Sequence, residues 1–193
     1  MKHKNRTVVV VLLFALVLLA TVLFFDDIGN NKERSLKKIY DRTCITGIEA
    51  KIVRGTSLSG LINEGATVKI FFGYYNCNEV RRGDIVVYNY SGDPNPIIKI
   101  AKGLPGDEFH LQKSAGGWNL VINDEIIKNS QNQIYTFSEQ GHKMLSLYEN
   151  DYKAVIPVDA YLLLGNLASG SLDSTRFGLV GKTDILGKVE LAK

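Results

Sequence analysis

The fold of this chain is decided by residues 96–107, which read Pro96-Ile97-Ile98-Lys99-Ile100-Ala101-Lys102-Gly103-Leu104-Pro105-Gly106-Asp107. The apolar first half predicts a strand, and the Leu-Pro-Gly-Asp end predicts a tight turn. Lys99 stands inside this strand, although lysine is rarely fully buried without a partner. Burial lowers the pKa of an amine, and a neutral lysine can act as a general base towards a serine. The alternative is an amphipathic strand whose lysines extend to water.

Short strand-like segments surround this stretch, and Gly, Asn, Asp and Pro separate them. Alternating or β-branched residues predict strands at 66–72, 84–90, 97–101, 108–112, 118–122, 160–164 and 187–191. Asn123-Asp124 predicts a hairpin turn into residues 125–127. Residues 129–152 show no clear period and predict an irregular or partly helical insertion. The pattern indicates a mainly β, antiparallel domain.

An apolar run without charge, Gly or Pro extends from Thr7 to Phe25. A helix of this length spans roughly 28 Å, close to a ~30 Å hydrocarbon core. Basic residues precede the run at positions 2, 4 and 6, and Asp26 and Asp27 follow it, which places the N-terminus in the cytoplasm. We therefore expect a single-pass plasma-membrane protein. A cleaved signal peptide is the alternative, but the run exceeds the usual apolar region of ~7–15 residues and no small-x-small site closes it.

This interpretation divides the chain into four parts: a cytoplasmic tail at 1–6, a transmembrane signal anchor at 7–25, a juxtamembrane linker at 26–43 and an extracytoplasmic β-rich domain at 44–193. The last part is the size of one domain and long enough to bury a core. The net charge of +3 is modest and the basic residues are mostly scattered, so nothing indicates nucleic-acid binding.

Two cysteines, Cys44 and Cys77, lie in the part expected outside the cytoplasm. An oxidising compartment favours a disulfide between them, and a pair of free buried thiols is the alternative. Two cysteines cannot form a zinc site alone, and neither His110 nor His142 stands at ligand spacing from them.

Three further segments carry candidate chemistry. Residues 55–62, GTSLSGLI, place Ser57 among Gly and small residues, on exposed backbone where a hydroxyl and an amide donor can face a substrate. Residues 82–88, RGDIVVY, form a turn feeding a core strand, and residues 164–178, LGNLASGSLDSTRFG, form a strand end and a polar loop. Each segment alone is more typical of an ordinary loop or turn.

In this order and spacing, the four segments resemble bacterial type I signal peptidases, the membrane-bound Ser/Lys leader peptidases of serine peptidase family S26. The family pattern is S-M-x-P-T, R-G-D-[IV]-V, K-R-x-x-G-x-P-G-D and G-D-N-x-x-x-S-x-D-S-R-x-[FWY]-G. The resemblance covers nearly the whole chain. It implies an antiparallel, barrel-like β-sheet fold of the Ser/Lys peptidase type behind a single N-terminal transmembrane helix.

The resemblance also implies roles for individual residues. Ser57 matches the nucleophile, Lys99 the general base, Ser171 the serine that hydrogen-bonds and orients the lysine, and Asp173 the aspartate that helps to hold that loop. The backbone amide of Ser57 would supply one oxyanion donor. Some members add a serine hydroxyl two residues before the nucleophile, where this chain has Gly55, so the second donor stays open.

The chain departs from the family pattern without losing a proton-transfer group. The substitutions are Leu58 for methionine, Gly60 for proline, Ile100 for arginine and Asn166-Leu167 for Asp-Asn. An ungapped match places Thr175 at the family's arginine, with Arg176 one residue later, which leaves the family's Asp–Arg pair open. We therefore expect an active but divergent enzyme.

The implied substrate is an exported preprotein, cleaved after a small-x-small motif because shallow pockets accept only small side chains. Strand alternation places Lys99 on the face of Ile97 and Ala101, opposite Lys102. No metal or organic cofactor is expected, the lipid bilayer is a partner, and the protein is expected to be a monomer.

Three alternatives to this function stay open. They are a dedicated conjugation or pilin-type maturation peptidase of the same family, a non-catalytic anchored homologue that binds signal peptides, and a Ser-His-Asp hydrolase using His110 or His142.

Overall fold

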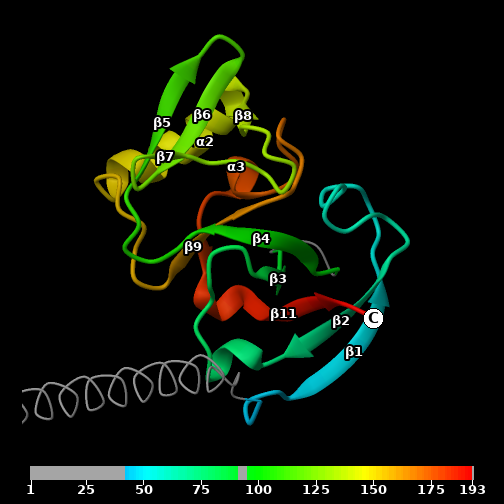
Figure 1. Cartoon of the computed structure of the whole chain (residues 1–193). Helices are drawn as coiled ribbons and strands as arrows, with labels where there is room; N and C mark the ends of the chain where they lie inside the picture. Colours follow the sequence, from blue (N-terminus) through cyan, green and yellow to red (C-terminus); the bar gives the residue numbers. More distant parts are fainter. Residues whose placement is uncertain (1–41, 91–94, 193) are drawn as a thin grey trace, which may run out of the picture. The chain divides into compact units, whose positions relative to one another are not determined.

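The computed structural model describes residues 42–90 and 95–192 (Figure 1). The predictions for the tail at 1–6 and the anchor at 7–25 lie outside these residues, as does nearly all of the linker at 26–43. Within the described ranges, no helix is long and apolar enough to cross a membrane.

The larger sheet contains seven antiparallel strands in the order β1-β2-β11-β3-β4-β9-β10 (Figure 1). Its strands are β1 (Gly47–Ile52), β2 (Thr67–Phe72), β3 (Ile85–Tyr88), β4 (Ile97–Gly103), β9 (Ala160–Leu164), β10 (Val180–Gly181) and β11 (Ile185–Leu191). Strand β4 lies between β3 and β9, but its pairing with β9 begins only at Ile100. Among the described residues, the first three residues of β4 therefore pair with β3 alone.

The smaller sheet contains four strands and carries a helix. Its strands are β5 (Phe109–Ser114), β6 (Gly117–Ile122), β7 (Glu125–Ile126) and β8 (Thr136–Phe137). Helix α2 (Glu139–Asp151) packs against β5, β6 and β8 and also contacts the short helix α3 (Ser174–Phe177). Two 3-10 turns, η1 (Tyr74–Asn76) and η2 (Lys182–Asp184), complete the elements in the described part.

Three apolar clusters form the core, and one of them anchors the segment between β1 and β2. That cluster joins Leu58 and Ile62 of this segment to Val87 of β3, Ile100 of β4 and Val189 of β11. Leu58 and Ile62 are almost completely buried. Because full burial of such a side chain contributes about 1.5–3 kcal/mol, these two residues fix the segment that carries Ser57 against the sheet.

The expected mainly antiparallel β fold is confirmed. Each predicted strand overlaps an observed one, and the predicted hairpin is the β6–β7 turn, in which Asn123 and Asp124 both adopt positive φ. The segment predicted as irregular or partly helical contains α2.

Strand β1 was not predicted from the sequence. It is an edge strand, and its Ile48 and Ile52 are 57% and 67% exposed, so these apolar side chains are not part of the core.

Candidate active site

Lys99 is buried in the part of β4 that has no β9 partner. Its residue surface is 3% exposed. Its Nζ lies 2.8 Å from Ser57 Oγ and donates a hydrogen bond of 2.8 Å to the carbonyl of Ile98. These are the two hydrogen bonds of this amine within the described structure, so Ser57 and Lys99, 42 residues apart, meet directly.

The environment of Lys99 lowers its pKa to about 8. Desolvation is the main cause, because burial penalises the charged ammonium form. The negative charge of Asp173 acts in the opposite direction and raises the pKa. At this distance a neutral Lys99 can accept the Ser57 hydroxyl proton while one of its N–H groups still donates to Ile98, as a general base requires.

Ser57 lies at the start of a tight turn fixed by its own hydrogen bonds. Ser59 N donates to the carbonyl of Thr56 at 2.9 Å, and Ile62 N donates to that of Leu58 at 2.8 Å. Gly55 precedes the turn with φ +81°, a conformation that side-chain-bearing residues rarely adopt. The N–H of Ser57 donates to no other described residue, so it is available to a substrate oxyanion.

Asp173 organises the loop beside the Ser57–Lys99 pair. It is fully buried, and its Oδ2 accepts hydrogen bonds from Gly165 N at 3.1 Å, Ser171 N at 3.1 Å and Ser171 Oγ at 2.7 Å. Its Oδ1 accepts from the backbone and hydroxyl of Thr175 at 3.1 and 2.7 Å. These hydrogen bonds satisfy both carboxylate oxygens of the buried side chain.

Ser171 approaches the pair without a hydrogen bond to Lys99. Its hydroxyl donates to Asp173. A Cβ added to Gly165 would collide with Ser171 Oγ and come within 2.7 Å of the Ser57 carbonyl, so Gly165 is the point at which the two segments meet. The predicted orienting role of Ser171 stays a prediction, and in this structure it would act through Asp173.

The Asp–Arg pair of the family pattern does not form here. Thr175 occupies the place of the arginine and satisfies Asp173 with its hydroxyl. Arg176 instead donates to the side chain of Gln140 at the start of α2. Asp173 thus accepts from a neutral hydroxyl at this place, and its negative charge raises the pKa of Lys99.

Arg82 and Asp107 form an ion pair that was not expected from the sequence. Both guanidinium contacts use Nη2, at 2.7 and 2.8 Å from the two carboxylate oxygens. Asp107 also accepts from Leu104 N at 2.6 Å and from Asn123 Nδ2 at 2.8 Å. Burial acts to raise the pKa of Asp107, but Arg82 and these donors hold it below its usual range. The pair joins the RGD and LPGD turns, which stand at the same end of β3 and β4.

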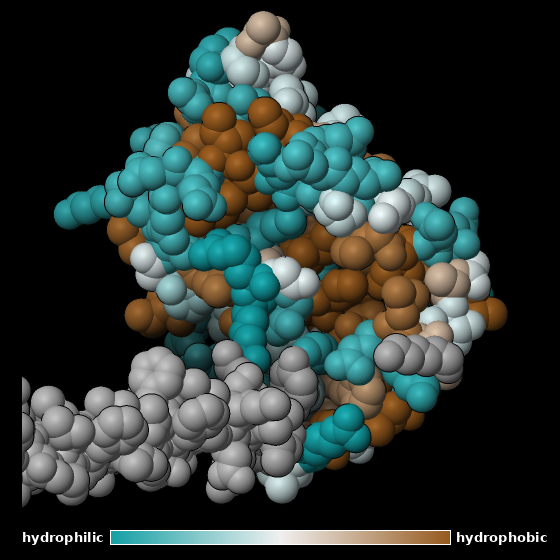
Figure 2. All heavy atoms as spheres, in the orientation of Figure 1, coloured by the Kyte–Doolittle hydropathy of each residue, from teal (hydrophilic) through white to brown (hydrophobic). Residues whose placement is uncertain are grey.

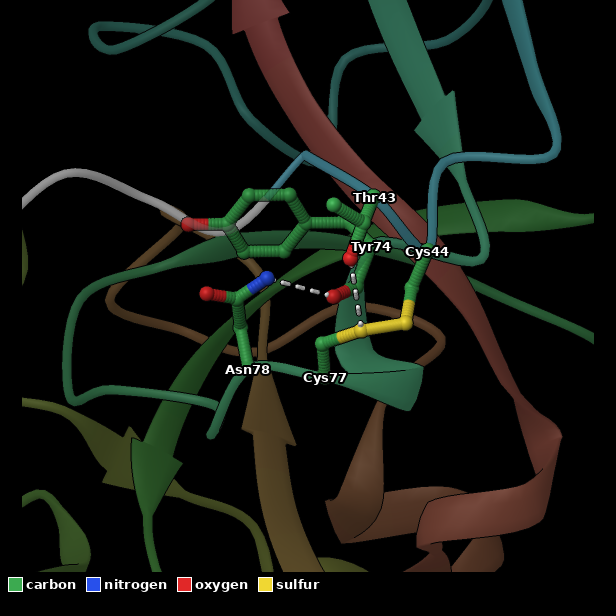
Figure 3. Close-up of a disulfide and its surroundings, with 5 residues drawn as sticks. All are labelled: Thr43, Cys44, Tyr74, Cys77 and Asn78. Carbon is green, nitrogen blue, oxygen red and sulfur yellow. Dashed lines mark hydrogen bonds between the residues drawn. A yellow bond between two sulfur atoms is a disulfide. The ribbon is translucent and has the colours of Figure 1, made fainter.

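The two cysteines form a disulfide (Figure 3). The Cα atoms of Cys44 and Cys77 are 5.8 Å apart, within the usual range for a disulfide, and no free cysteine lies in the described part of the chain. Asn78 Nδ2 donates to the carbonyl of Tyr74 at 2.8 Å beside the bridge. Of the two readings that the sequence left open, the structure has the disulfide.

Neither His110 nor His142 forms a hydrogen bond with Ser57 in the described structure. The ring of His142 stacks on Trp118 at 3.6 Å between centroids and lies 3.6 Å from Glu139. The described residues include no group of His, Cys, Asp and Glu side chains arranged to hold a metal ion. Among residues 42–90 and 95–192, Lys99 is the one side chain that forms a hydrogen bond with the Ser57 hydroxyl.

A serine beside a desolvated lysine, on an antiparallel β scaffold, is the arrangement needed by a hydrolase that uses a lysine base. Comparison with known proteins agrees with this class. Residues 3–192 match the family described as "Signal peptidase, peptidase S26", so the chain belongs to that family of peptidases.

Individual relatives cover most of the chain. It is 27% identical to signal peptidase IB of Staphylococcus aureus (strain COL) over 142 residues, 71% of this chain and 73% of the relative. It is 29% identical to signal peptidase I P of Bacillus subtilis subsp. natto over 147 residues, 74% and 75% of the two chains. A crystal structure of a signal peptidase I from Enterococcus faecalis V583 aligns with a TM-score of 0.41 and 23% identity, covering 57% of this chain and 97% of that one.

Proposed function

We propose that this protein is a membrane-anchored serine endopeptidase that removes signal peptides from exported preproteins, with Ser57 as nucleophile and Lys99 as general base. The observation that carries the proposal is the 2.8 Å contact between the Ser57 hydroxyl and the buried, pKa-lowered Lys99 amine. Membership of the signal peptidase family supports the same chemistry and substrate class.

In the acylation step, neutral Lys99 takes the Ser57 hydroxyl proton while Oγ attacks the scissile carbonyl. The oxyanion that forms accepts a hydrogen bond from the Ser57 N–H. Lys99, now an ammonium, gives its proton to the departing amine nitrogen as the C–N bond breaks. The products of this step are the free mature protein and an ester between Ser57 and the signal peptide.

In the deacylation step, Lys99 is neutral again and removes a proton from a water molecule that attacks the ester carbonyl. The C–O bond to Ser57 breaks, and the proton held by Lys99 returns to Ser57 Oγ. Both steps need one proton shuttle, and the lone pair of Lys99 can serve in each because its ammonium form is destabilised by burial.

The open edge of β4 supports binding of an extended substrate. Backbone groups of Ala101 face β3, since Ala101 N donates to Asp84 O and its carbonyl accepts from Gly83 N. By strand alternation the backbone of Ile98 faces the other edge, beside the Ser57–Lys99 pair. A substrate strand can pair there, and this mode of recognition reads backbone rather than large side chains.

An apolar surface adjoins this edge. Figure 2 shows apolar side chains gathered over the larger sheet on the face that carries the segment between β1 and β2. The partly buried apolar residues of the cluster around that segment include Leu61, Ile85 and Ile98. We infer that this surface receives the small apolar residues that precede the cleavage site.

Residues 7–25 would supply the anchor, with the domain outside the cytoplasm and the lipid bilayer as a partner. The disulfide supports an extracytoplasmic location of the domain, since disulfides persist in oxidising compartments. The protein would act as a monomer and without a cofactor, because the proposed chemistry needs only one serine, one lysine and one amide.

The decisive experiment is cleavage of a purified preprotein that carries an Ala-x-Ala site by the full-length protein in detergent. We expect a single cut after the second alanine, and no cut by Ser57→Ala protein. Binding without cleavage by the wild type would identify a non-catalytic homologue. Cleavage of one preprotein in a broad panel would instead identify a dedicated maturation peptidase.

A further inference from the structure

Asn166 is a buried amide that contacts the nucleophile segment at two points. It is fully buried and follows Gly165 at the end of β9. Its backbone N–H donates to the carbonyl of Ser57 at 2.6 Å. Its side-chain Nδ2 donates to the carbonyl of Ser59 at 2.8 Å, across 107 residues of sequence. Asn166 therefore holds the backbone on both sides of Leu58.

The same side chain also holds the turn at residues 129–133. Nδ2 of Asn166 donates to Ser130 Oγ at 2.8 Å, and Oδ1 accepts from Ser130 N at 3.0 Å. The carbonyl of Asn166 accepts from Asn129 Nδ2 at 2.9 Å. Every polar group of Asn166 is thus used, and its side chain needs both a donor and an acceptor to make these bonds.

The turn at 129–133 is held together by its own hydrogen bonds. Asn129 Oδ1 accepts from the backbone N–H groups of Gln131 and Gln133, each at 2.9 Å. Asn129 N donates to the carbonyl of Gln133 at 2.9 Å. The turn is therefore a preformed unit that Asn166 docks onto the segment carrying Ser57.

Gly60 provides the second contact between this turn and the nucleophile segment. A Cβ at Gly60 would lie 2.7 Å from Cδ of the Gln131 side chain, and Gly60 has φ +83°. Proline, the residue of the family pattern here, is fixed near φ −65° and cannot take this conformation. Gly60 and Asn166, both departures from that pattern, thus belong to one interface.

We propose that Asn166 and the turn at 129–133 form a clamp that positions Ser57 against Lys99, with Asn166 as the positioning residue. This inference rests on the proposed function. An aspartate at 166, as in the family pattern, would direct a carboxylate oxygen at the Ser59 carbonyl with no proton between them, and the buried repulsion would displace the segment.

The test compares Asn166→Asp with Asn119→Asp, a matched control. Asn119 is also nearly buried, but it lies in β6, where Oδ1 accepts from Ser114 and Thr136 side chains at 3.2 and 3.3 Å. Both variants introduce the same buried carboxylate. Measured on the full-length protein in detergent, kcat and KM for an Ala-x-Ala preprotein are combined with hydrogen exchange of residues 55–62 by mass spectrometry.

We expect Asn166→Asp to lower kcat at least 30-fold per folded molecule, to leave KM within threefold, and to speed exchange in residues 55–62. Asn119→Asp should leave both readouts at the wild-type level. Equal losses in the two variants, or unchanged exchange in residues 55–62 of Asn166→Asp, would overturn the clamp. If the wild type cleaves nothing, but hydrogen exchange in residues 55–62 is faster in Asn166→Asp and not in Asn119→Asp, the clamp is supported and the proposed function is refuted.

Discussion

The two ends of β4 carry lysines only three residues apart, and their surroundings differ in one decisive respect. Lys99 has a serine hydroxyl at 2.8 Å. Lys102 donates to the carbonyl of Lys128 at 2.8 Å and lies 5.5 Å from the ring centre of Tyr135. Burial lowers the pKa of both, and Arg82 lowers that of Lys102 further.

A lowered pKa therefore does not by itself identify a catalytic lysine. Lys102 points its amine at a carbonyl, which cannot give up a proton, whereas Lys99 faces a hydroxyl, which can. The hydrogen-bond partner of the amine distinguishes Lys99, the proposed base, from Lys102. Burial does not distinguish them, because it lowers the pKa of both. Four measurements test whether the partner of the amine determines the role of each lysine.

The largest effect is expected from removing the pair itself. Ser57→Ala and Lys99→Ala should each reduce single-turnover cleavage by ~10³-fold or more, because general-base and nucleophilic catalysis are both lost. Lys99→Arg should be equally inactive, since a guanidinium keeps its proton at any working pH. Near-normal cleavage by Lys99→Ala would refute the Ser/Lys assignment, provided that circular dichroism shows a folded protein.

The next effect is the dependence on pH. With a pKa of about 8, Lys99 is mainly protonated at pH 7 and mainly neutral at pH 9. Since only the neutral form accepts the Ser57 proton, kcat/KM should rise about tenfold between these values and then level off. Lys102→Ala should show the same profile. A profile that is flat, or that moves in Lys102→Ala, would mean that another group titrates.

A loss smaller than that from removing the pair is expected from the loop that adjoins it. Ser171→Ala removes one hydrogen bond to Asp173 and should lower kcat by roughly 10-fold through misplacement of the site. Asp173→Asn should lower kcat further and also shift the pH profile to lower pH, because the charge of Asp173 raises the pKa of Lys99. An unshifted pH profile in Asp173→Asn would show that the charge of Asp173 does not act on Lys99.

The smallest effect belongs to Lys102. Lys102→Ala should keep cleavage within about twofold of wild type, and the lost hydrogen bond to Lys128 should cost about 1 kcal/mol of unfolding free energy. Chemical denaturation and steady-state cleavage give the two numbers. A loss of activity comparable to that of Lys99→Ala would show that the two lysines act together.

The sequence predicted those parts of the molecule whose signals are local. The β4 stretch and the strands around it follow from alternation and turn residues. The contact between Ser57 and Lys99, 42 residues apart, was expected only from the resemblance to the signal peptidase family. Helix α2 lacks such a signal: of its thirteen residues, only Gly141 and Leu145 are buried, so its apolar face is too narrow to set a period.

Contacts between distant segments that the family pattern does not contain could not be predicted. The hydrogen bonds of Asn166 reach residues 36 and 107 positions away, and the sequence does not show which carbonyls an amide will meet. The replacement of the Asp–Arg pair by Thr175 is similar, because an arginine stands only one residue further along. In both places the motif pattern indicated the residues that depart from the family but not the hydrogen bonds that they form.

The disulfide has a mechanical consequence. Terminal segments and sheet edges fray at little cost in free energy, and β1 is an edge strand near the start of the described chain. Cys44 precedes β1 and is tied to Cys77, which follows η1 and the end of β2 that pairs with the start of β1. Tension applied at Arg42 therefore passes through a covalent bond into η1 and cannot peel β1 from β2 one hydrogen bond at a time. The segment that begins after Ile52 and carries Ser57 is in this way shielded from load on the preceding chain.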